Sequence, residues 1–284
     1  MLSYYQAIIL GLLQGVSELF PISSLGHSVI LPRLLGWNIH QNDGYFLTFL
    51  IATHFATAIV LFLFFIKDWY KILLGFLRSI KEREIKESDT YAKLAWLLII
   101  GTIPAGIIGI LFQDTLRTLF ASAQIAAFFL FLNGFLLLGA EKLRKITKQN
   151  ELIDQDLSIS KLRYLQAAKI GLIQVIALIP GLSRTGSTIA GSLLVGLSHR
   201  DSIRFSFLLA TPIIGAAALL KLPDVFTSYH ALFGQFIVGF FASAISAFFA
   251  VTFLTKYFQK NTLLPFGIYC LVIGGVTSLL FFFT

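Results

Sequence analysis

Long runs of apolar residues, separated by short polar connections, dominate the chain. Six of these runs contain roughly 20 residues each, the length that an α-helix needs to cross a hydrocarbon layer of about 30 Å. They are residues 45–66, 94–112, 122–140, 205–220, 232–255 and 264–283. The pattern predicts an all-α polytopic membrane protein in which residues 1–284 form a single integral membrane domain.

Two further apolar segments, 2–36 and 165–197, are broken by polar and helix-breaking residues. The interruptions are Pro21, Ser23, Ser24 and Gly26 in the first segment and Pro180, Gly181, Ser183 and Gly186 in the second. Irregular backbone survives at membrane depth only where protein or a water-filled cavity satisfies its N–H and C=O groups. We therefore expect each segment to form a re-entrant pair of half-length helices.

The two broken segments also match each other in sequence. Residues 11–27 and 171–187 are identical at five of 17 aligned positions. The blocks 49–58 and 207–216, which follow them in the same order, are identical at five of ten positions. Three predicted spans separate the two broken segments, so the second should lie upside down relative to the first.

This arrangement predicts two inverted-topology repeats, about 1–140 and 160–284, each a re-entrant broken helix pair plus three transmembrane helices. Inverted repeats with broken helices place a binding site near the bilayer midplane, at the interface between the repeats.

Composition and charge agree with a membrane protein. Hydrophobic residues make up 57% of the chain and charged residues 13%, with a mean hydropathy of +0.83. These values exclude a soluble enzyme, a disordered tail and a DNA-binding module. The net charge of +8 is no sign of a nucleic-acid partner, because connections 67–93 and 141–169 hold seven Lys or Arg residues each. Such basic connections lie in the cytoplasm, which places both termini on the opposite side. The single cysteine, Cys270, excludes an intrachain disulfide.

Two charged residues, Glu18 and Arg184, lie within the broken segments rather than in connections or at span ends. A charge at the bilayer centre costs at least about 2.5–3.5 kcal/mol on insertion scales. Opposite charges in matching segments indicate one shared polar cavity. The alternative is a buried ion pair that only holds the repeats together.

Polar side chains surround both charges. Gln14 lies four residues before Glu18 and shares its helix face. The others are Ser23, Ser24 and His27 near Glu18, and Ser183, Thr185, Ser187 and Thr188 near Arg184. Helix N-termini rich in glycine and hydroxyl groups bind phosphate, and the Arg fork matches phosphate oxygens. The residues therefore predict an anionic ligand, with Ser, His and Glu available for nucleophilic and acid–base chemistry.

Simpler interpretations of some of these residues stay open. Ser23 and Ser183 are equally compatible with capping of the half-helices. His54, inside the predicted span 45–66, fits a helix-packing hydrogen bond as well as a catalytic role.

At these residues the chain resembles the undecaprenyl-diphosphatase family of bacterial inner membranes, the bacitracin-resistance type. The matching stretches are QGVSE at 14–18, PISSLGH at 21–27, PGLSRTGST at 180–188 and FSFLLATP at 205–212. The resemblance covers essentially the whole chain. The chain departs from the family pattern at Gln14, often Glu, at Leu25, often Thr or Ser, and at Leu50, often Asp.

The resemblance implies hydrolysis of undecaprenyl diphosphate, the C55 lipid carrier, to undecaprenyl phosphate and inorganic phosphate. It implies a site open to the periplasmic side, support by Mg²⁺ or Ca²⁺, and competition with bacitracin, which sequesters the substrate. Glu18 is the only carboxylate near the motifs and so the only candidate metal ligand. The sequence leaves open whether the protein forms a homodimer.

We assign roles on this basis as a hypothesis. Arg184 holds the diphosphate together with Ser183, Thr185 and Thr188. Ser24 is the nucleophile, with Ser23 beside it, and His27 takes the serine proton or protonates the leaving group. Glu18 orients His27 or helps to hold the cation, and Gln14 supplies a hydrogen bond. Direct attack by water is the mechanistic variant.

Two other functions are alternatives. A lipid-phosphate transporter or flippase would use the same inverted repeats. An unrelated class of lipid phosphatases carries K-x₆-R-P, P-S-G-H and S-R-x₅-H motifs. After Ser183-Arg184 and five intervening residues, however, the chain has Ala190 where that class has His.

Overall fold

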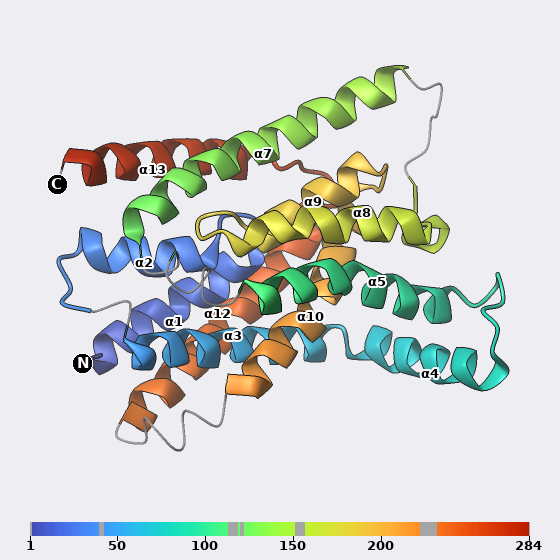
Figure 1. Ribbon diagram of the computed structural model, residues 1–284, viewed down its shortest axis with the longest axis horizontal. Helices are drawn as coiled ribbons and strands as arrows, with labels where there is room; N and C mark the ends of the chain where they lie inside the picture. The colour runs from blue at the N-terminus through green and yellow to red at the C-terminus, as the bar shows by residue number, and fades with distance from the viewer. Residues whose placement is uncertain are drawn as a thin grey trace.

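The computed structural model describes residues 2–39, 43–112, 119, 122–150, 157–221 and 232–283, and within these ranges the chain is almost entirely helical (Figure 1). The helices are α1 (Tyr4–Leu19), α2 (Ser24–Leu34), α3 (Gly44–Phe64), α4 (Ile66–Glu82), α5 (Thr90–Leu111), α7 (Ala123–Asn150), η1 (Ile159–Lys161), α8 (Tyr164–Val175), η2 (Ile176–Leu178), α9 (Arg184–Leu194), α10 (His199–Lys221), α12 (Phe233–Tyr257) and α13 (Leu264–Phe283). The all-α class is thereby confirmed.

The six predicted spans are present as α3, α5, α7, α10, α12 and α13, each long and apolar enough to cross a membrane. Two of these helices extend beyond their predicted ends, because their polar flanking residues are helical as well. α7 continues to Asn150 instead of ending at 140, and α10 begins at His199 instead of 205. At the start of α10, the Ser198 hydroxyl accepts a hydrogen bond from the Asp201 N–H at 3.0 Å, which stabilises the earlier start. Most of the predicted connections 113–121 and 221–231 lies outside the described residues.

The predicted polar connection 67–93 contains a helix, α4, that the search for apolar runs did not find. One face of α4 is buried through Trp69, Ile72 and Gly75, spaced three residues apart. Gly75 lies so close to the backbone of Ala92 at the start of α5 that a Cβ would collide with it. α4 therefore folds by packing its narrow buried face on α5.

Both broken segments form pairs of half-length helices. In Figure 1, α1 starts and α2 ends at the left of the molecule, whereas α8 starts and α9 ends toward the right. The turns that join the half-helices lie in the interior between these ends. Helices α3 and α10, which carry the second pair of matching blocks, pack against each other. The inverted-repeat relation itself stays a prediction from the sequence.

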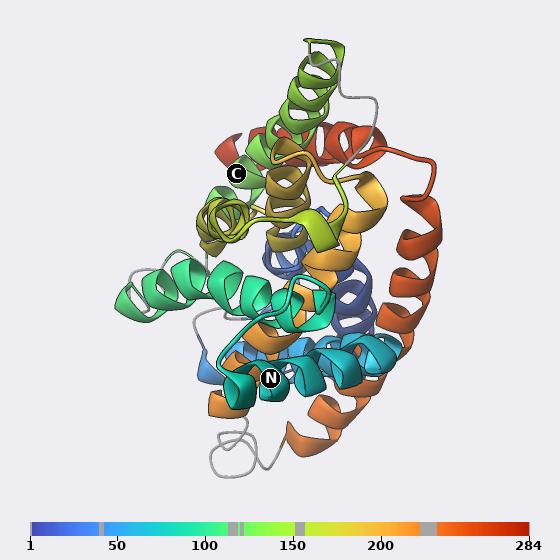
Figure 2. The ribbon, with the colours of Figure 1, turned by 90° about the vertical axis from the view of Figure 1, so that its right-hand side faces the viewer.

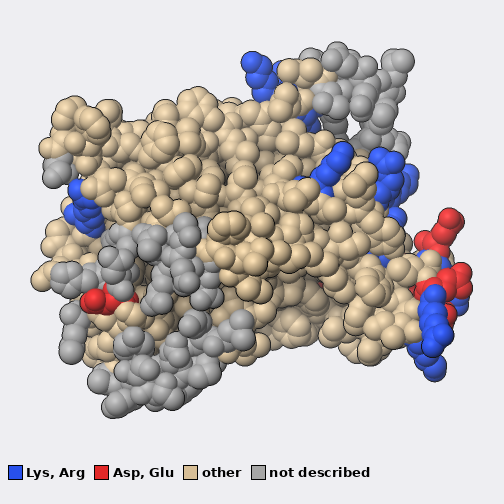
Figure 3. Space-filling model, viewed as in Figure 1, with Lys and Arg blue, Asp and Glu red and all other residues tan. Residues whose placement is uncertain are grey.

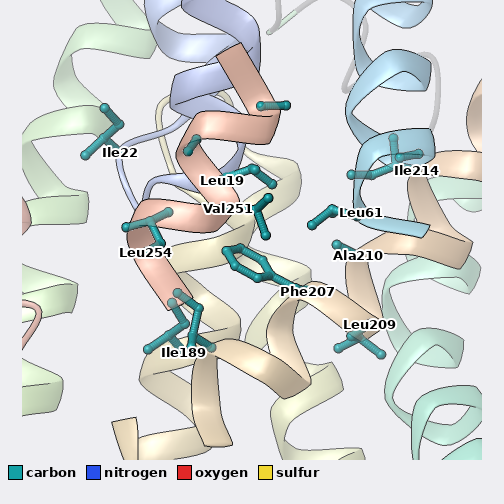
Figure 4. Packing of buried hydrophobic residues seen from close by; sticks show 14 of the residues in the cluster. Leu19, Ile22, Leu61, Ile189, Phe207, Leu209, Ala210, Ile214, Val251 and Leu254 are labelled. Atoms are coloured by element: carbon teal, nitrogen blue, oxygen red, sulfur yellow. The ribbon is translucent and has the colours of Figure 1, made fainter. Parts of the chain in front are cut away.

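Longer helices pack against the half-helices. Helices α12 and α3 pack against α1, and α7 and α10 pack against α9; Figure 2 shows the dark-blue helix α1 beside α12. α1 packs closely along α12, where a Cβ at Gly11 would collide with the Gly239 carbonyl; small residues allow such approach in membranes. Figure 4 shows Leu19 of α1, Phe207 of α10 and Val251 of α12 pointing toward one another. This packing fixes where the first turn sits.

Charge is distributed unevenly along the molecule. Most Lys and Arg side chains visible in Figure 3 lie toward its right-hand end, and the face between the two ends shows few charges. This matches the basic connections that the sequence placed on one side of the membrane.

Candidate active site

Glu18, at the C-terminal end of α1, connects the two broken segments. Its carboxylate Oε1 accepts a hydrogen bond from Arg184 Nη2 at 2.9 Å. Its Oε2 accepts from the Ser24 hydroxyl at 2.5 Å and from Gln14 Nε2 at 3.2 Å. The Glu18 side chain is 7% exposed, so this cluster of polar groups is shielded from the bilayer by protein. The predicted meeting of the two membrane-embedded charges is confirmed.

Each of the two turns leads into a half-helix that a serine caps. The Ser23 hydroxyl accepts from the Gly26 N–H at 3.2 Å, and the Ser183 hydroxyl accepts from the Gly186 N–H at 3.0 Å. Capping, the simpler interpretation, is therefore part of what both serines do. Helix α2 begins at Ser24 and α9 begins at Arg184, and both residues contact Glu18. The positive ends of these two helix dipoles therefore point toward the Glu18 carboxylate.

The two turns touch directly. The Thr185 hydroxyl donates to the main-chain oxygen of Glu18 at 2.9 Å. A Cβ added to Gly186 would lie 3.2 Å from the Pro21 oxygen, and one added to Gly26 would lie 3.2 Å from the Gly181 Cα. A side chain at either position would require the neighbouring backbone to shift by a few tenths of an ångström, so glycine favours this close approach.

Asn133, in the middle of α7, ties both turns to a third helix. Its Nδ2 donates to the Pro21 oxygen at 2.9 Å, and its Oδ1 accepts from the Ser183 N–H at 3.1 Å. The side chain is fully buried. Sequence reasoning missed this residue, although an amide in the middle of the predicted span 122–140 is the kind of signal that revealed Glu18.

The histidine next to Glu18 is His54 of α3, and not His27. His54 Nε2 lies 3.2 Å from Glu18 Oε2, while its Nδ1 lies 2.6 Å from the Leu50 oxygen. Both nitrogens thus face acceptors, an arrangement that suits a doubly protonated ring.

His27 lies beside the cluster and faces another helix. Its Nδ1 contacts the Ser23 oxygen at 2.7 Å and its Nε2 contacts the Tyr269 hydroxyl at 2.9 Å. Among the described residues it makes no hydrogen bond to Ser24 or Glu18, so the expected orientation of His27 by Glu18 is not seen. The physical reason is that α2 turns this ring toward α13.

The remaining predicted residue, Thr188, lies one helical turn further along α9. Its hydroxyl contacts the oxygens of Arg184 and Thr185, at 2.9 and 3.1 Å, and the Ser206 hydroxyl of α10. The structure therefore brings Gln14, Glu18, Ser24, Arg184 and Thr185 together, whereas Thr188 supports the start of α9.

The cluster suits a phosphate-bearing ligand electrostatically. A carboxylate faces a guanidinium and an imidazole ring, and two helix N-termini add positive potential. Arg184 Nη1 is buried and has no partner among the described residues, so one arm of the guanidinium is left for a ligand. This unused donor favours a ligand site over a purely structural ion pair.

Comparison with known proteins identifies the family of this chain. The profile of the family described as bacitracin resistance protein BacA matches residues 7–276. The undecaprenyl-diphosphatase of Mycolicibacterium paratuberculosis is 42% identical, over 97% of this chain and 96% of its own length. Undecaprenyl-diphosphatase 2 of Chromobacterium violaceum is 43% identical, over 97% of this chain and 98% of its own. This chain belongs to the BacA family. The resemblance carried by the four motif stretches is thereby confirmed.

The residues present fit a divalent cation only in a limited way. The described residues contain no group of three or more His, Cys, Asp or Glu side chains that could hold a metal by themselves. However, Gln14 Oε1 is buried without a partner among them, beside the Glu18 carboxylate. Mg²⁺ commonly uses one or two protein oxygens and takes the others from substrate phosphates and water. Glu18 and Gln14 could supply these one or two protein oxygens.

Proposed function

We propose that the protein hydrolyses undecaprenyl diphosphate to undecaprenyl phosphate and inorganic phosphate. This reaction returns the lipid carrier to peptidoglycan synthesis and confers resistance to bacitracin, which sequesters the diphosphate. The substrate explains a polar site at membrane depth, because the diphosphate can enter the cluster while the prenyl chain stays among apolar helices.

One observation carries the proposal: Glu18 joins Arg184 of one turn to Ser24 of the other, at 2.9 and 2.5 Å. Arg184 would bind the diphosphate with Nη1 and with the N–H groups at the start of α9. Ser24 would attack the terminal phosphorus. Because its hydroxyl already donates to Glu18, that carboxylate is placed to take the serine proton.

The bond from phosphorus to the bridging oxygen would break, and its electron pair would leave with undecaprenyl phosphate. Water would then attack the phosphoserine, and His27 would take a proton from this water. The bond from Ser24 Oγ to phosphorus would break, Glu18 would return the proton to Ser24, and inorganic phosphate would leave. A divalent cation, held by Glu18 and Gln14 Oε1 together with phosphate oxygens, would neutralise negative charge on the diphosphate when bound.

We propose a multi-pass location in the bacterial inner membrane, with the basic end in the cytoplasm and access to the site from the periplasmic side. The gathering of Lys and Arg toward one end of the molecule supports this orientation of the chain.

Phosphate release from C55 diphosphate by the purified protein in detergent tests the proposal. We expect Ser24→Ala to lose at least about 100-fold in kcat, whereas Ser198→Ala, a serine at the start of α10 away from the cluster, stays near wild type. A ³²P label from the terminal phosphate that remains on the wild-type protein after acid quenching would identify the phosphoserine route. Wild-type protein that moves the lipid across proteoliposomes without releasing phosphate would overturn the proposal and favour a transporter.

A further inference from the structure

Tyr269, on α13, reaches the candidate site through one atom. Its hydroxyl oxygen lies 2.9 Å from Nε2 of His27, and the two rings are nearly parallel, at 15° with centroids 5.7 Å apart. Tyr269 is 38% exposed, whereas His27 is 8% exposed. The tyrosine thus lies between the buried histidine and the outer surface of the bundle, and none of the roles above includes it.

The hydrogen bonds fix where the protons of His27 lie. The Ser23 oxygen, 2.7 Å from Nδ1, is a carbonyl and can only accept, so Nδ1 must carry a hydrogen. In the neutral ring, Nε2 is then unprotonated and accepts the Tyr269 O–H. In the charged ring, Nε2 donates to the Tyr269 oxygen. A tyrosine hydroxyl serves both states because it is donor and acceptor.

We propose that Tyr269 is a positioning residue for the hydrolysis proposed above: it holds the His27 ring so that Nε2 is the nitrogen that gains and loses the proton. This rests on the proposed function. Glu18 takes the proton of the attacking Ser24 hydroxyl, and His27 takes a proton from the water that later attacks the phosphoserine. Because the one lone pair of Nε2 faces the Tyr269 oxygen, the Tyr269 hydroxyl passes its own proton to Nε2 and takes the proton of the water in the same step. The reverse transfer returns the ring to its neutral state.

A purely structural role for this hydroxyl is less consistent with the contacts. The two helices are also joined further along, where Arg33 of α2 lies over the Phe281 ring of α13, 4.4 Å from its centroid. α13 in addition packs along α7, where Gly274 lies against the Phe131 backbone. Removal of one hydroxyl should therefore leave α13 in place.

Tyr269→Phe keeps the ring and removes only the hydroxyl. We expect kcat for C55 diphosphate to fall about 3- to 10-fold, as for loss of one hydrogen bond, with KM within twofold of wild type. The matched control is Tyr257→Phe, which removes a hydroxyl that contacts the Thr262 oxygen at 3.3 Å at the exposed end of α12. Its kcat should not change. In a His27→Gln protein, adding Tyr269→Phe should cause no further loss.

The imidazole ¹⁵N spectrum of histidine-labelled protein tests the contact without relying on activity. The resonances that disappear in His27→Gln belong to His27. We expect its Nε2 resonance to shift in Tyr269→Phe and to stay in place in Tyr257→Phe. An unshifted resonance, or a further kcat loss in the His27→Gln background, would overturn the inference. Absence of phosphate release by the wild-type protein would instead overturn the proposed function and leave the spectroscopic result to decide the contact.

Discussion

The two broken segments have the same local plan but different chemistry. Each has a glutamine on its first half-helix, a serine cap, and a glycine three residues after the cap that accompanies a close backbone approach. The first segment supplies the carboxylate of Glu18 and the second supplies the guanidinium of Arg184. At the position that matches Glu18, the second segment has Leu178. The two segments therefore share their capped turns and divide the two charges between them.

The difference extends to backbone and hydrogen bonding. Ser23 has a positive φ of 69°, while Ser183 has an ordinary φ of −88°. Gln14 donates to Glu18, whereas both side-chain polar atoms of Gln174 are buried with no partner among the described residues. The backbone strain lies in the first turn, as at many functional sites. The second turn carries Arg184.

The largest expected effect comes from removing either charge. Glu18→Gln and Arg184→Gln should each reduce kcat for C55 diphosphate by about 100- to 10,000-fold, measured as phosphate release. Because the two side chains act as a unit, the double variant should lose much less than the product of the two losses. The control, Glu82→Gln, breaks the exposed ion pair between Glu82, the last residue of α4, and Lys86, and it should leave kcat unchanged. Independent, multiplying losses would show that the two segments do not share one site.

The next effect comes from Asn133, which holds the two turns together. Asn133→Leu leaves the Ser183 N–H and the Pro21 oxygen without this partner, and each unsatisfied buried group costs about 1–3 kcal/mol. We expect a clear drop in Tm in detergent, together with loss of activity below that temperature. Asn261→Leu makes the same chemical change at an exposed amide near the end of α12 and should alter neither. An equal drop in both variants would argue against the bridge.

These residues also show which features of the fold and the site the sequence predicts. The hydrocarbon layer imposes a length on every span, so the six long helices could be located from apolar runs alone. Glu18 and Arg184 stood out because charge is costly in the same layer. The long-range partners of the two histidines, Glu18 for His54 and Tyr269 for His27, depend on how α3 and α13 lie against the half-helices. No local pattern encodes that placement. Helix α4 could not be found as an apolar run, because its buried face is narrow and charged residues alternate with apolar ones over the rest of its surface.

A smaller effect separates the two glutamines. Gln14→Leu removes the 3.2 Å hydrogen bond to Glu18, and we expect a loss of about 2- to 10-fold in kcat. Gln174→Leu removes two buried polar atoms that have no described partner. Because burying such atoms costs about 1–3 kcal/mol, this variant should raise Tm and keep wild-type kcat. Paired measurements of kcat and Tm check both. A large kcat loss in Gln174→Leu would mean that the second segment carries chemistry beyond Arg184.

The smallest expected effect distinguishes the two caps. A non-glycine residue at positive φ stores roughly 1–3 kcal/mol of strain, and glycine at an N-cap costs only a few tenths of a kcal/mol relative to serine. Ser23→Gly should therefore be neutral or slightly stabilising. Ser183→Gly relieves no strain and adds about 0.5–1 kcal/mol of backbone entropy cost, so its Tm should fall below that of Ser23→Gly in the same detergent. The reverse order would show that the positive φ of Ser23 carries no strain and that the two turns are more alike than their backbones suggest.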